Sequence, residues 1–232
     1  MELKLPLPVM KYRGSCLLFG KIDYINLAPF HVFLKRNLKS SQLKQSIEYK
    51  KSYPADLNRK FKRRHIDAAF ISSIESRRGN FRCLDAGIVA KKEIQSVLVK
   101  KGGYKADSHS ATSNALAKVL GIDGEVIIGD KALKLYCEDQ DLYVDLAKEW
   151  HKKTKKPFVF ARFCMVRHCK FYKSLIQKFL KAEIKIPQYV LHKYTKRSGI
   201  KCKDIKAYLK LVSYNIDTKS AKSLKLFLKE SR

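Results

Sequence analysis

The chain has 232 residues, of which 45% are hydrophobic and 11% aromatic, and this composition excludes a disordered protein. The length fits one large domain or two lobes. The 50 lysines and arginines outweigh the 21 acidic residues, and the net charge of +29 attracts anions of any size. Because the basic residues are spread along the chain, we expect small anionic substrates rather than a specific nucleic acid.

The cysteines and the amino terminus indicate where the protein works. Six cysteines contain no CxxC pair, which predicts free or buried thiols in a reducing compartment. The prolines and charged residues within the first 16 residues leave no apolar core for a signal peptide, and no apolar run reaches the length of a membrane span. We therefore expect a cytoplasmic protein without membrane insertion.

The first third of the chain alternates short apolar runs with helical patterns, as α/β proteins do. Pro54 suits the first turn of a helix, and the run IDAAFI suits a buried strand. The resulting βαβαβ unit has a strand over 15–19, a helix over 27–36, a strand over 47–49, a helix over 54–64 and a strand over 66–71.

The pattern then changes, and a second, smaller α/β unit follows. It comprises strands over 84–90 and 94–99, a helix that opens near Ser110, a strand over 126–128, a helical turn over 131–136 and a strand over 157–161. Everything beyond residue 161 reads as amphipathic helix, over 171–180, 187–196, 203–212 and 218–229. We predict two lobes with a cleft between them, residues 1–92 and 161–232 forming one and residues 93–160 the other.

Polar residues recur where ligands bind in such folds, beyond the carboxyl ends of strands and at the starts of helices. Asn26 lies between a strand and a helix, where it could cap the helix or donate to a bound anion. Ser73 has the same setting, with a plain cap as the alternative. Ser110, Thr112 and Ser113 give three hydroxyls in four residues on the other lobe, more than one cap needs. Two facing anion sites predict a ligand with two negative groups.

Motifs for other chemistries are absent. The sequence has no glycine-rich nucleotide loop, no GxSxG elbow and no HExxH, and its six histidines lack ligand spacing. We expect neither a metal nor a cofactor. Any chemistry would rely on positioned hydrogen bonds.

Six blocks, in this order, carry a resemblance to a known family: GKIDYINLAPF, IDAAFISSIE, GIVAKKEIQSVLVKKG, SHSATSNALAKVL, VIIGDKAL and DLAKEWHKKTKKPFVFA. The chain resembles the chorismate dehydratases of the futalosine route to menaquinone over nearly its whole length. The resemblance implies the two-lobed fold of type II periplasmic binding proteins. It also implies loss of water from chorismate, without a cofactor, to give 3-[(1-carboxyvinyl)oxy]benzoate (3-enolpyruvyl-benzoate).

The resemblance also assigns roles. Asn26 and Ser73 fall on positions tied to catalysis, as amide donor and hydroxyl donor, and Ser110, Thr112 and Ser113 would hold a carboxylate. Asp130 could accept from the substrate hydroxyl or be a structural turn residue. The proton acceptor is unassigned, and a carboxylate of the substrate itself is one possibility.

The chain departs from the family at Ser72, where proline is usual, at Ser76, where an aromatic residue is common, and at Lys155, where glycine is usual. Three other functions stay open: a solute-binding receptor for a small carboxylate, the sibling dihydroxy-naphthoate synthase, and a nucleic-acid-binding protein supported by charge alone. The oligomeric state does not follow from the sequence.

Overall fold

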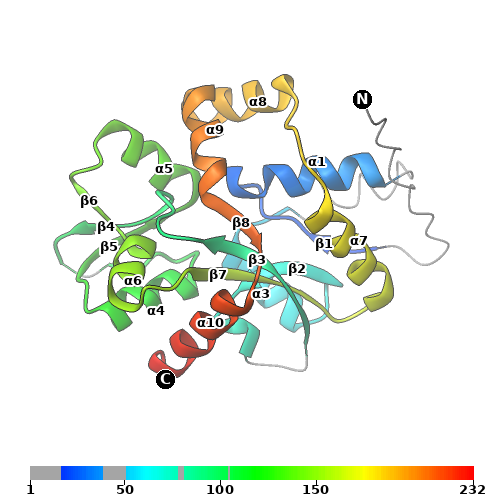
Figure 1. The fold of residues 1–232 in the computed structure, drawn as a ribbon, viewed down its shortest axis with the longest axis horizontal. Coiled ribbons are helices and arrows are strands. Elements are labelled where there is room, and N and C mark those ends of the chain that lie inside the picture. The colour runs from blue at the N-terminus through cyan, green and yellow to red at the C-terminus, as the bar shows by residue number, and fades with distance from the viewer. Residues whose placement is uncertain (1–16, 39–50, 78–80, 104) are drawn as a thin grey trace.

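The computed structural model describes residues 17–38, 51–77, 81–103 and 105–232, and it contains two β-sheets flanked by helices (Figure 1). The larger sheet has the strand order β1-β2-β7-β3-β8 and the smaller one the order β5-β4-β6. The strands are β1 (Phe19–Gly20), β2 (Ala68–Ser72), β3 (Arg82–Ala90), β4 (Val97–Lys101), β5 (Gly124–Ile128), β6 (Tyr143–Asp145), β7 (Phe158–Met165) and β8 (Val212–Asn215).

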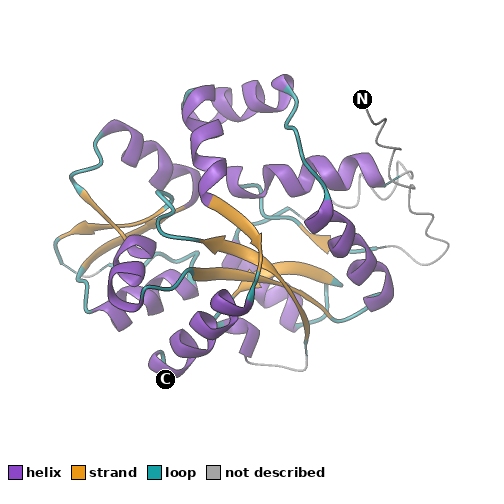
Figure 2. Ribbon diagram, viewed as in Figure 1, coloured by secondary structure: helices purple, strands orange, loops and turns teal. Residues whose placement is uncertain are grey.

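Helices cover both sheets, as Figure 2 shows. The α-helices are α1 (Ala28–Asn37), α3 (Pro54–Lys62), α4 (Ala111–Leu120), α5 (Gly129–Glu138), α6 (Leu146–Thr154), α7 (Cys169–Lys181), α8 (Gln188–Ser198), α9 (Cys202–Leu211) and α10 (Thr218–Glu230). Two short 3₁₀ turns, η1 (Ile25–Leu27) and η2 (Glu75–Arg77), follow β1 and β2. Among the described residues, no helix is long and apolar enough to cross a bilayer.

The chain passes from the larger sheet to the smaller one after β3 and returns in β7. The smaller sheet with α4, α5 and α6 forms one end of the molecule, and the larger sheet with α1 and α7 forms the other (Figure 1). The α/β class is confirmed. We keep the two lobes as a proposal, with one adjustment: Phe158 pairs with Ala90, so β7 belongs to the larger sheet from its first residue.

Most predicted elements are present within a few residues of their expected bounds. The strand expected over 47–49 lies outside the described residues. The sequence reading omitted β6 and α6, and the expectation that only helices follow residue 161 is wrong because β7 continues to Met165 and β8 follows α9. β8 pairs with β3 through Val212 and Ala90. It therefore forms an edge of the larger sheet.

The core of the larger lobe is built from phenylalanines that far-apart segments contribute. Phe30 of α1 meets Phe70 of β2 edge to face at 5.1 Å between ring centroids, and Phe179 of α7 at 5.0 Å. Phe163 of β7 completes the cluster, 5.2 Å from Phe70. All four rings are buried. This packing fixes α1, and with it the turn that carries Asn26, against the sheet.

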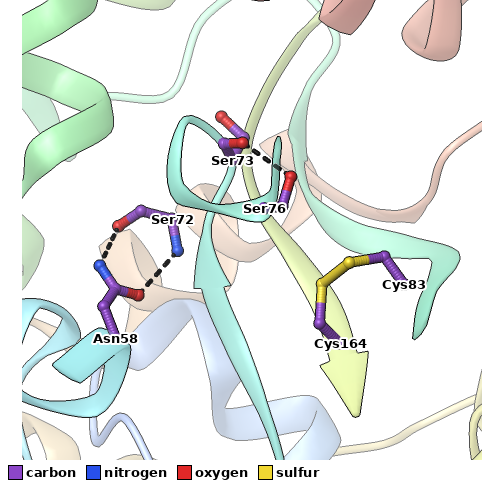
Figure 3. Close-up of a disulfide and its surroundings, with 6 residues drawn as sticks. All are labelled: Asn58, Ser72, Ser73, Ser76, Cys83 and Cys164. Carbon is purple, nitrogen blue, oxygen red and sulfur yellow. Dashed lines mark hydrogen bonds between the residues drawn. A yellow bond between two sulfur atoms is a disulfide. The ribbon is translucent and has the colours of Figure 1, made fainter. Parts of the chain in front are cut away.

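The expectation of free thiols is wrong for two of the cysteines. Cys83 of β3 and Cys164 of β7 are register partners in the antiparallel pair, with their Cα atoms 4.0 Å apart, and they form a disulfide (Figure 3). The spacing of the cysteines in the sequence gave no sign of this bond, because 81 residues separate Cys83 from Cys164. Cys137, Cys169 and Cys202 are free thiols.

Candidate functional site

A pocket lies between the two sheets and encloses about 590 Å³ of space free of protein atoms, part of it open to solvent. Strand ends and helix starts of both sheets line it, so residues far apart in sequence meet there. Its polar lining residues are Tyr24, Asn26, Ser72, Ser96, Ser110 and Ser113. Phe70, Phe160, Ile88, Ile94 and Ile128 are among the apolar ones. The described lining residues carry no ionised side chain.

Asn26 is in the pocket and caps no helix. It lies inside η1, whose N-cap is Tyr24, and the N-cap of α1 is Leu27; neither makes a side-chain cap bond. The backbone carbonyl of Asn26 accepts a hydrogen bond of 2.5 Å from the Tyr214 hydroxyl. Its side-chain Oδ1 is buried, and no group within the described ranges donates to it. The amide oxygen therefore has unused hydrogen-bonding capacity beside the pocket.

Ser110 and Ser113 face the pocket from the other sheet, at the start of α4. Ser110 is the N-cap of α4, its Oγ accepting from the Ser113 amide at 3.2 Å and donating to the Ser113 hydroxyl at 2.7 Å. The Ser113 hydroxyl is left with its own proton to donate. A helix N-terminus with a free hydroxyl suits a carboxylate.

Ser72 is a pocket residue that sequence reasoning treated only as a departure. It ends β2, and its hydroxyl accepts from the Asn58 side-chain amide at 3.0 Å while its N–H donates to Asn58 Oδ1 at 3.1 Å (Figure 3). Because the Ser72 hydroxyl accepts from Asn58, its own proton is free to be donated to a ligand in the pocket. The available signal was its place at the carboxyl end of a buried strand, which it shares with Ser73.

Ser73 and Thr112 are not among the residues that line the pocket, and their side chains contact each other. Both are buried, and their hydroxyl oxygens are 3.4 Å apart. Thr112 Oγ1 also accepts from the Ile74 amide at 3.3 Å. Ser73 precedes η2 and accepts from Ser76 through its carbonyl. These contacts connect the segment that follows β2 to α4. The roles of Ser73 and Thr112 toward a substrate stay predictions.

Asp130 lies in the first turn of α5 and is not among the residues that line the pocket. Its Oδ1 accepts from the Ile25 amide of η1 at 2.8 Å, and its Oδ2 pairs with Arg197 of α8. Burial raises the pKa of the Asp130 carboxyl despite these partners. Both carboxylate oxygens are thus engaged by protein groups, which favours the structural alternative over a substrate contact.

Tyr24 and Ser96 are two further polar groups that sequence reasoning did not single out. Burial, and then the charges of Asp107 and Asp130, raise the pKa of Tyr24 to about 12, so the phenol keeps its proton at neutral pH. Ser96 is buried, and its carbonyl accepts from the Gly129 amide at the start of α5. The pocket therefore offers neutral hydroxyls and one amide.

The site contains no candidate metal centre. No group of three or more metal-binding side chains occurs in the described ranges of the chain. The arrangement can orient an anion by hydrogen bonds and shield it from water.

Comparison with known proteins assigns the chain to a family. A family model described as menaquinone biosynthesis matches residues 17–123 and 119–232, nearly all of the chain. The chain belongs to this menaquinone biosynthesis family. A curated relative from Campylobacter jejuni, named chorismate dehydratase, is 52% identical over 215 residues, covering 92% of this chain and 96% of the relative.

Solved structures place the menaquinone biosynthesis protein in the periplasmic-binding-protein fold. A protein from Archaeoglobus fulgidus aligns with a TM-score of 0.68 at 16% identity, over 92% of this chain and 95% of its own. A Candida albicans gene product with the generic periplasmic binding protein fold gives 0.55 at 12%, over 94% and 90%. An alkanesulfonate-binding protein from Xanthomonas axonopodis pv. citri, bound to MOPS, gives 0.54 at 13%, over 92% and 91%. The predicted fold is confirmed.

Proposed function

We propose that this protein is a chorismate dehydratase, a hydro-lyase that converts chorismate to 3-enolpyruvyl-benzoate for menaquinone biosynthesis by the futalosine route. The observation that carries the proposal is the 52% identity to a protein of that name over 92% of the chain. The pocket supports it independently, since hydroxyls from both lobes surround a space with apolar walls. Chorismate has two carboxylates, a ring hydroxyl and an apolar ring edge.

The reaction removes a ring proton and the neighbouring hydroxyl as water, and the new double bond makes the ring aromatic. Because aromatisation drives the reaction, the enzyme mainly has to hold the leaving groups in position and stabilise developing charge. No ionised carboxylate or histidine is among the described lining residues. Our candidate for the proton acceptor is therefore a carboxylate of the substrate itself, and no cofactor is required.

The pocket geometry suggests how the substrate is held. Ser110 and Ser113, at the start of α4, would bind one carboxylate, and Ser72 would donate to the other from the opposite lobe. The unpaired Oδ1 of Asn26 would accept from the ring hydroxyl. The apolar side chains around the pocket lower the local polarity, which strengthens each of these hydrogen bonds.

The net charge of +29 gives the enzyme a field that attracts its dianionic substrate from solution. We propose a cytoplasmic location, where a biosynthetic enzyme acting on chorismate would work.

A turnover assay tests the proposal. The purified protein is incubated with chorismate, without added metal or cofactor, and the aromatic product is followed by absorbance and identified by mass spectrometry. We expect continuous formation of 3-enolpyruvyl-benzoate. Tight binding of chorismate without turnover would instead favour a solute-binding receptor. An inert chorismate together with strong, salt-sensitive binding of DNA would favour a nucleic-acid-binding protein.

A further inference from the structure

The carboxylate of Asp130, at the start of α5, contacts the turn that carries Asn26. Its Oδ1 accepts a hydrogen bond of 2.8 Å from the backbone amide of Ile25, which lies 105 residues earlier in the chain. Ile25 opens η1 and stands between Tyr24 and Asn26, which both line the pocket. Asp130 is not among the lining residues. Its carboxylate therefore holds the backbone between two pocket residues without lining the pocket itself.

This hydrogen bond supplies a cap that η1 does not provide for itself. The first amides of a helical turn have no partner within the turn and need an acceptor from elsewhere. The N-cap residue of η1 is Tyr24, whose side chain makes no cap bond. Within the turn the Leu27 amide donates to the Tyr24 carbonyl at 3.1 Å, whereas the Ile25 amide donates to Asp130. A carboxylate is a stronger acceptor for such an amide than a neutral oxygen.

Arg197 of α8 orients the Asp130 carboxylate. The Arg197 guanidinium pairs with Oδ2 of Asp130 and, at 2.7 Å, with Asp23, which lies just before η1. The same guanidinium lies over the ring of Tyr194, 4.6 Å from its centroid. With Oδ2 engaged by Arg197, the other oxygen of Asp130 is directed at the Ile25 amide. Arg197 thus connects α5 to the chain on the near side of the turn.

The far side of the turn is fixed by a second long-range hydrogen bond. The Tyr214 hydroxyl donates to the backbone carbonyl of Asn26 at 2.5 Å. The Ile25 side chain is fully buried. The Ile25 amide and the Asn26 carbonyl are therefore both bound by residues far away in the sequence. Because a side chain follows its backbone, these two bonds together set where the amide of Asn26 lies.

We propose that Asp130 is a positioning residue for the reaction: its carboxylate, oriented by Arg197, caps η1 and keeps the Asn26 side chain in place in the pocket. This inference rests on the proposed function, because it gives Asp130 a part in the turnover of chorismate. A displacement of about 1 Å at a group that meets the substrate lowers a rate by about 100-fold. Loss of the cap should therefore affect turnover although Asp130 does not line the pocket.

Two variants of Asp130 test its part in turnover. We expect Asp130→Ala to lower kcat about tenfold or more while KM for chorismate changes less than about threefold, because a misplaced Asn26 raises the barrier of the chemical step. Asp130→Asn keeps an oxygen for the Ile25 amide, so its kcat should stay within about threefold of wild type. Equal losses of kcat in the two variants would overturn the proposal, because they would mean that the charge of Asp130 acts directly on the substrate.

Asp67→Ala is the matched control. Asp67 is buried and has the same kinds of partner as Asp130, since it accepts from the Leu18 amide at 2.8 Å and from Arg167 at 2.6 Å. Neither Asp67 nor Leu18 lines the pocket. We expect a lower melting temperature but a kcat within about twofold of wild type. If Asp67→Ala does not fold, Asp67→Asn takes its place. A loss of kcat in the control as large as in Asp130→Ala would overturn the proposal.

Hydrogen exchange tests the cap without a substrate. By NMR, the Ile25 amide should exchange about tenfold or more faster in Asp130→Ala than in wild type, measured relative to the amides of β7 in the middle of the larger sheet. In the Asp67 control this ratio should change less than about threefold. An unchanged ratio in Asp130→Ala would overturn the proposal. Fast exchange in Asp130→Ala of a protein that does not turn over chorismate would instead overturn the proposed function, and with it the part in turnover, whereas the cap would stand.

Discussion

Asn26 lies in a turn that needs no side-chain cap, and its amide oxygen is buried without a protein donor in the part of the chain that the structure describes. A buried polar atom without a partner destabilises the folded protein by about 1–3 kcal/mol. A protein that keeps such an atom in its pocket gains from it when a ligand hydroxyl fills the position. Binding of a ligand hydroxyl would therefore explain why the protein keeps the destabilising, unpaired oxygen of Asn26.

We predict that Asn26→Ala lowers kcat/KM by about 100-fold or more and does not lower the free energy of unfolding, because the substitution also removes the buried oxygen that has no partner. The matched control is Asn37→Ala, because the Asn37 amide is also buried but donates to the Phe33 carbonyl within α1. That variant should lose stability, by about 1 kcal/mol, and keep its activity. Steady-state kinetics and urea unfolding measure both. If Asn26→Ala lost stability and activity in the proportion seen for Asn37→Ala, Asn26 would be structural.

The two neighbouring serines should differ in what they affect. Ser72 faces the pocket, so we expect Ser72→Ala to raise KM or lower kcat, with a loss of about tenfold in kcat/KM. Ser73 contacts Thr112, and we expect Ser73→Ala to act by breaking this contact. Its loss of kcat/KM should then overlap with the loss caused by Thr112→Val. Kinetics of the two single variants and the double variant check this. Full additivity of Ser73→Ala and Thr112→Val would indicate instead that Ser73 contacts the substrate directly.

At the level of elements, the start of α5 packs against the aromatic ring of Tyr24. Gly129 has a φ of +71°, and a Cβ atom there would lie 2.9 Å from two atoms of the Tyr24 ring. Only glycine allows both this backbone and this close approach. The contact connects a strand end of the smaller sheet to η1 of the larger lobe, at the wall of the pocket.

We predict that Gly129→Ala destabilises the protein by about 1–3 kcal/mol and lowers kcat/KM, because the backbone is strained and the Tyr24 ring must move. Gly121→Ala is the matched control, since Gly121 has a φ of +65° and open space where the Cβ would be. It should lose about 1 kcal/mol of stability from backbone strain alone and keep full activity. Thermal unfolding and steady-state kinetics of the two variants separate the effect of backbone strain from the effect of moving the Tyr24 ring. Equal kinetic losses in the two variants would argue against the Tyr24 contact.

Elements whose apolar residues recur at helical spacing could be predicted from the sequence, as α10 and α4 with its Ser110 cap illustrate. β8 could not, because its few residues, VSYN, become a strand only through pairing with β3. The residues of the candidate site also divide into those that the sequence could predict and those that it could not. Asn26, Ser110 and Ser113 follow from their place at strand ends and helix starts, whereas Ser96 and Tyr208 meet only through tertiary packing. Asp130 lies in the first helical turn of α5 and not in a turn before the helix, and long-range partners decide where its carboxylate points.

At the scale of the whole molecule, charged groups connect the two proposed lobes. Arg197 of α8 pairs with Asp23 of the larger lobe at 2.7 Å and with Asp130 of the smaller one. On another side, the rings of Tyr53 and His109 stack with centroids 4.3 Å apart. These contacts connect segments that we assign to the two proposed lobes.

The pH dependence of stability should report this network. Burial favours the neutral acid, but Lys51, Lys21 and Arg197 outweigh it and lower the pKa of Asp23 from 3.8 to about 2. A depressed pKa stabilises the folded state above pH 4, and this contribution is lost as the pH falls toward 2. Asp23→Asn should therefore be less stable than wild type by about 1–2 kcal/mol at pH 7, with a gap that narrows below pH 4. Urea unfolding at several pH values measures it, and a gap independent of pH would contradict the assignment.

The central claim is that hydroxyls and an amide from two lobes hold a small dicarboxylate in the pocket between the sheets. A crystal structure of the protein with 3-enolpyruvyl-benzoate bound tests it most directly. We predict one carboxylate against Ser110 and Ser113 at the start of α4, the other within hydrogen-bonding distance of Ser72 or Ser96, and the ring beside Asn26. A product bound elsewhere, or held by residues of one lobe alone, would contradict the claim.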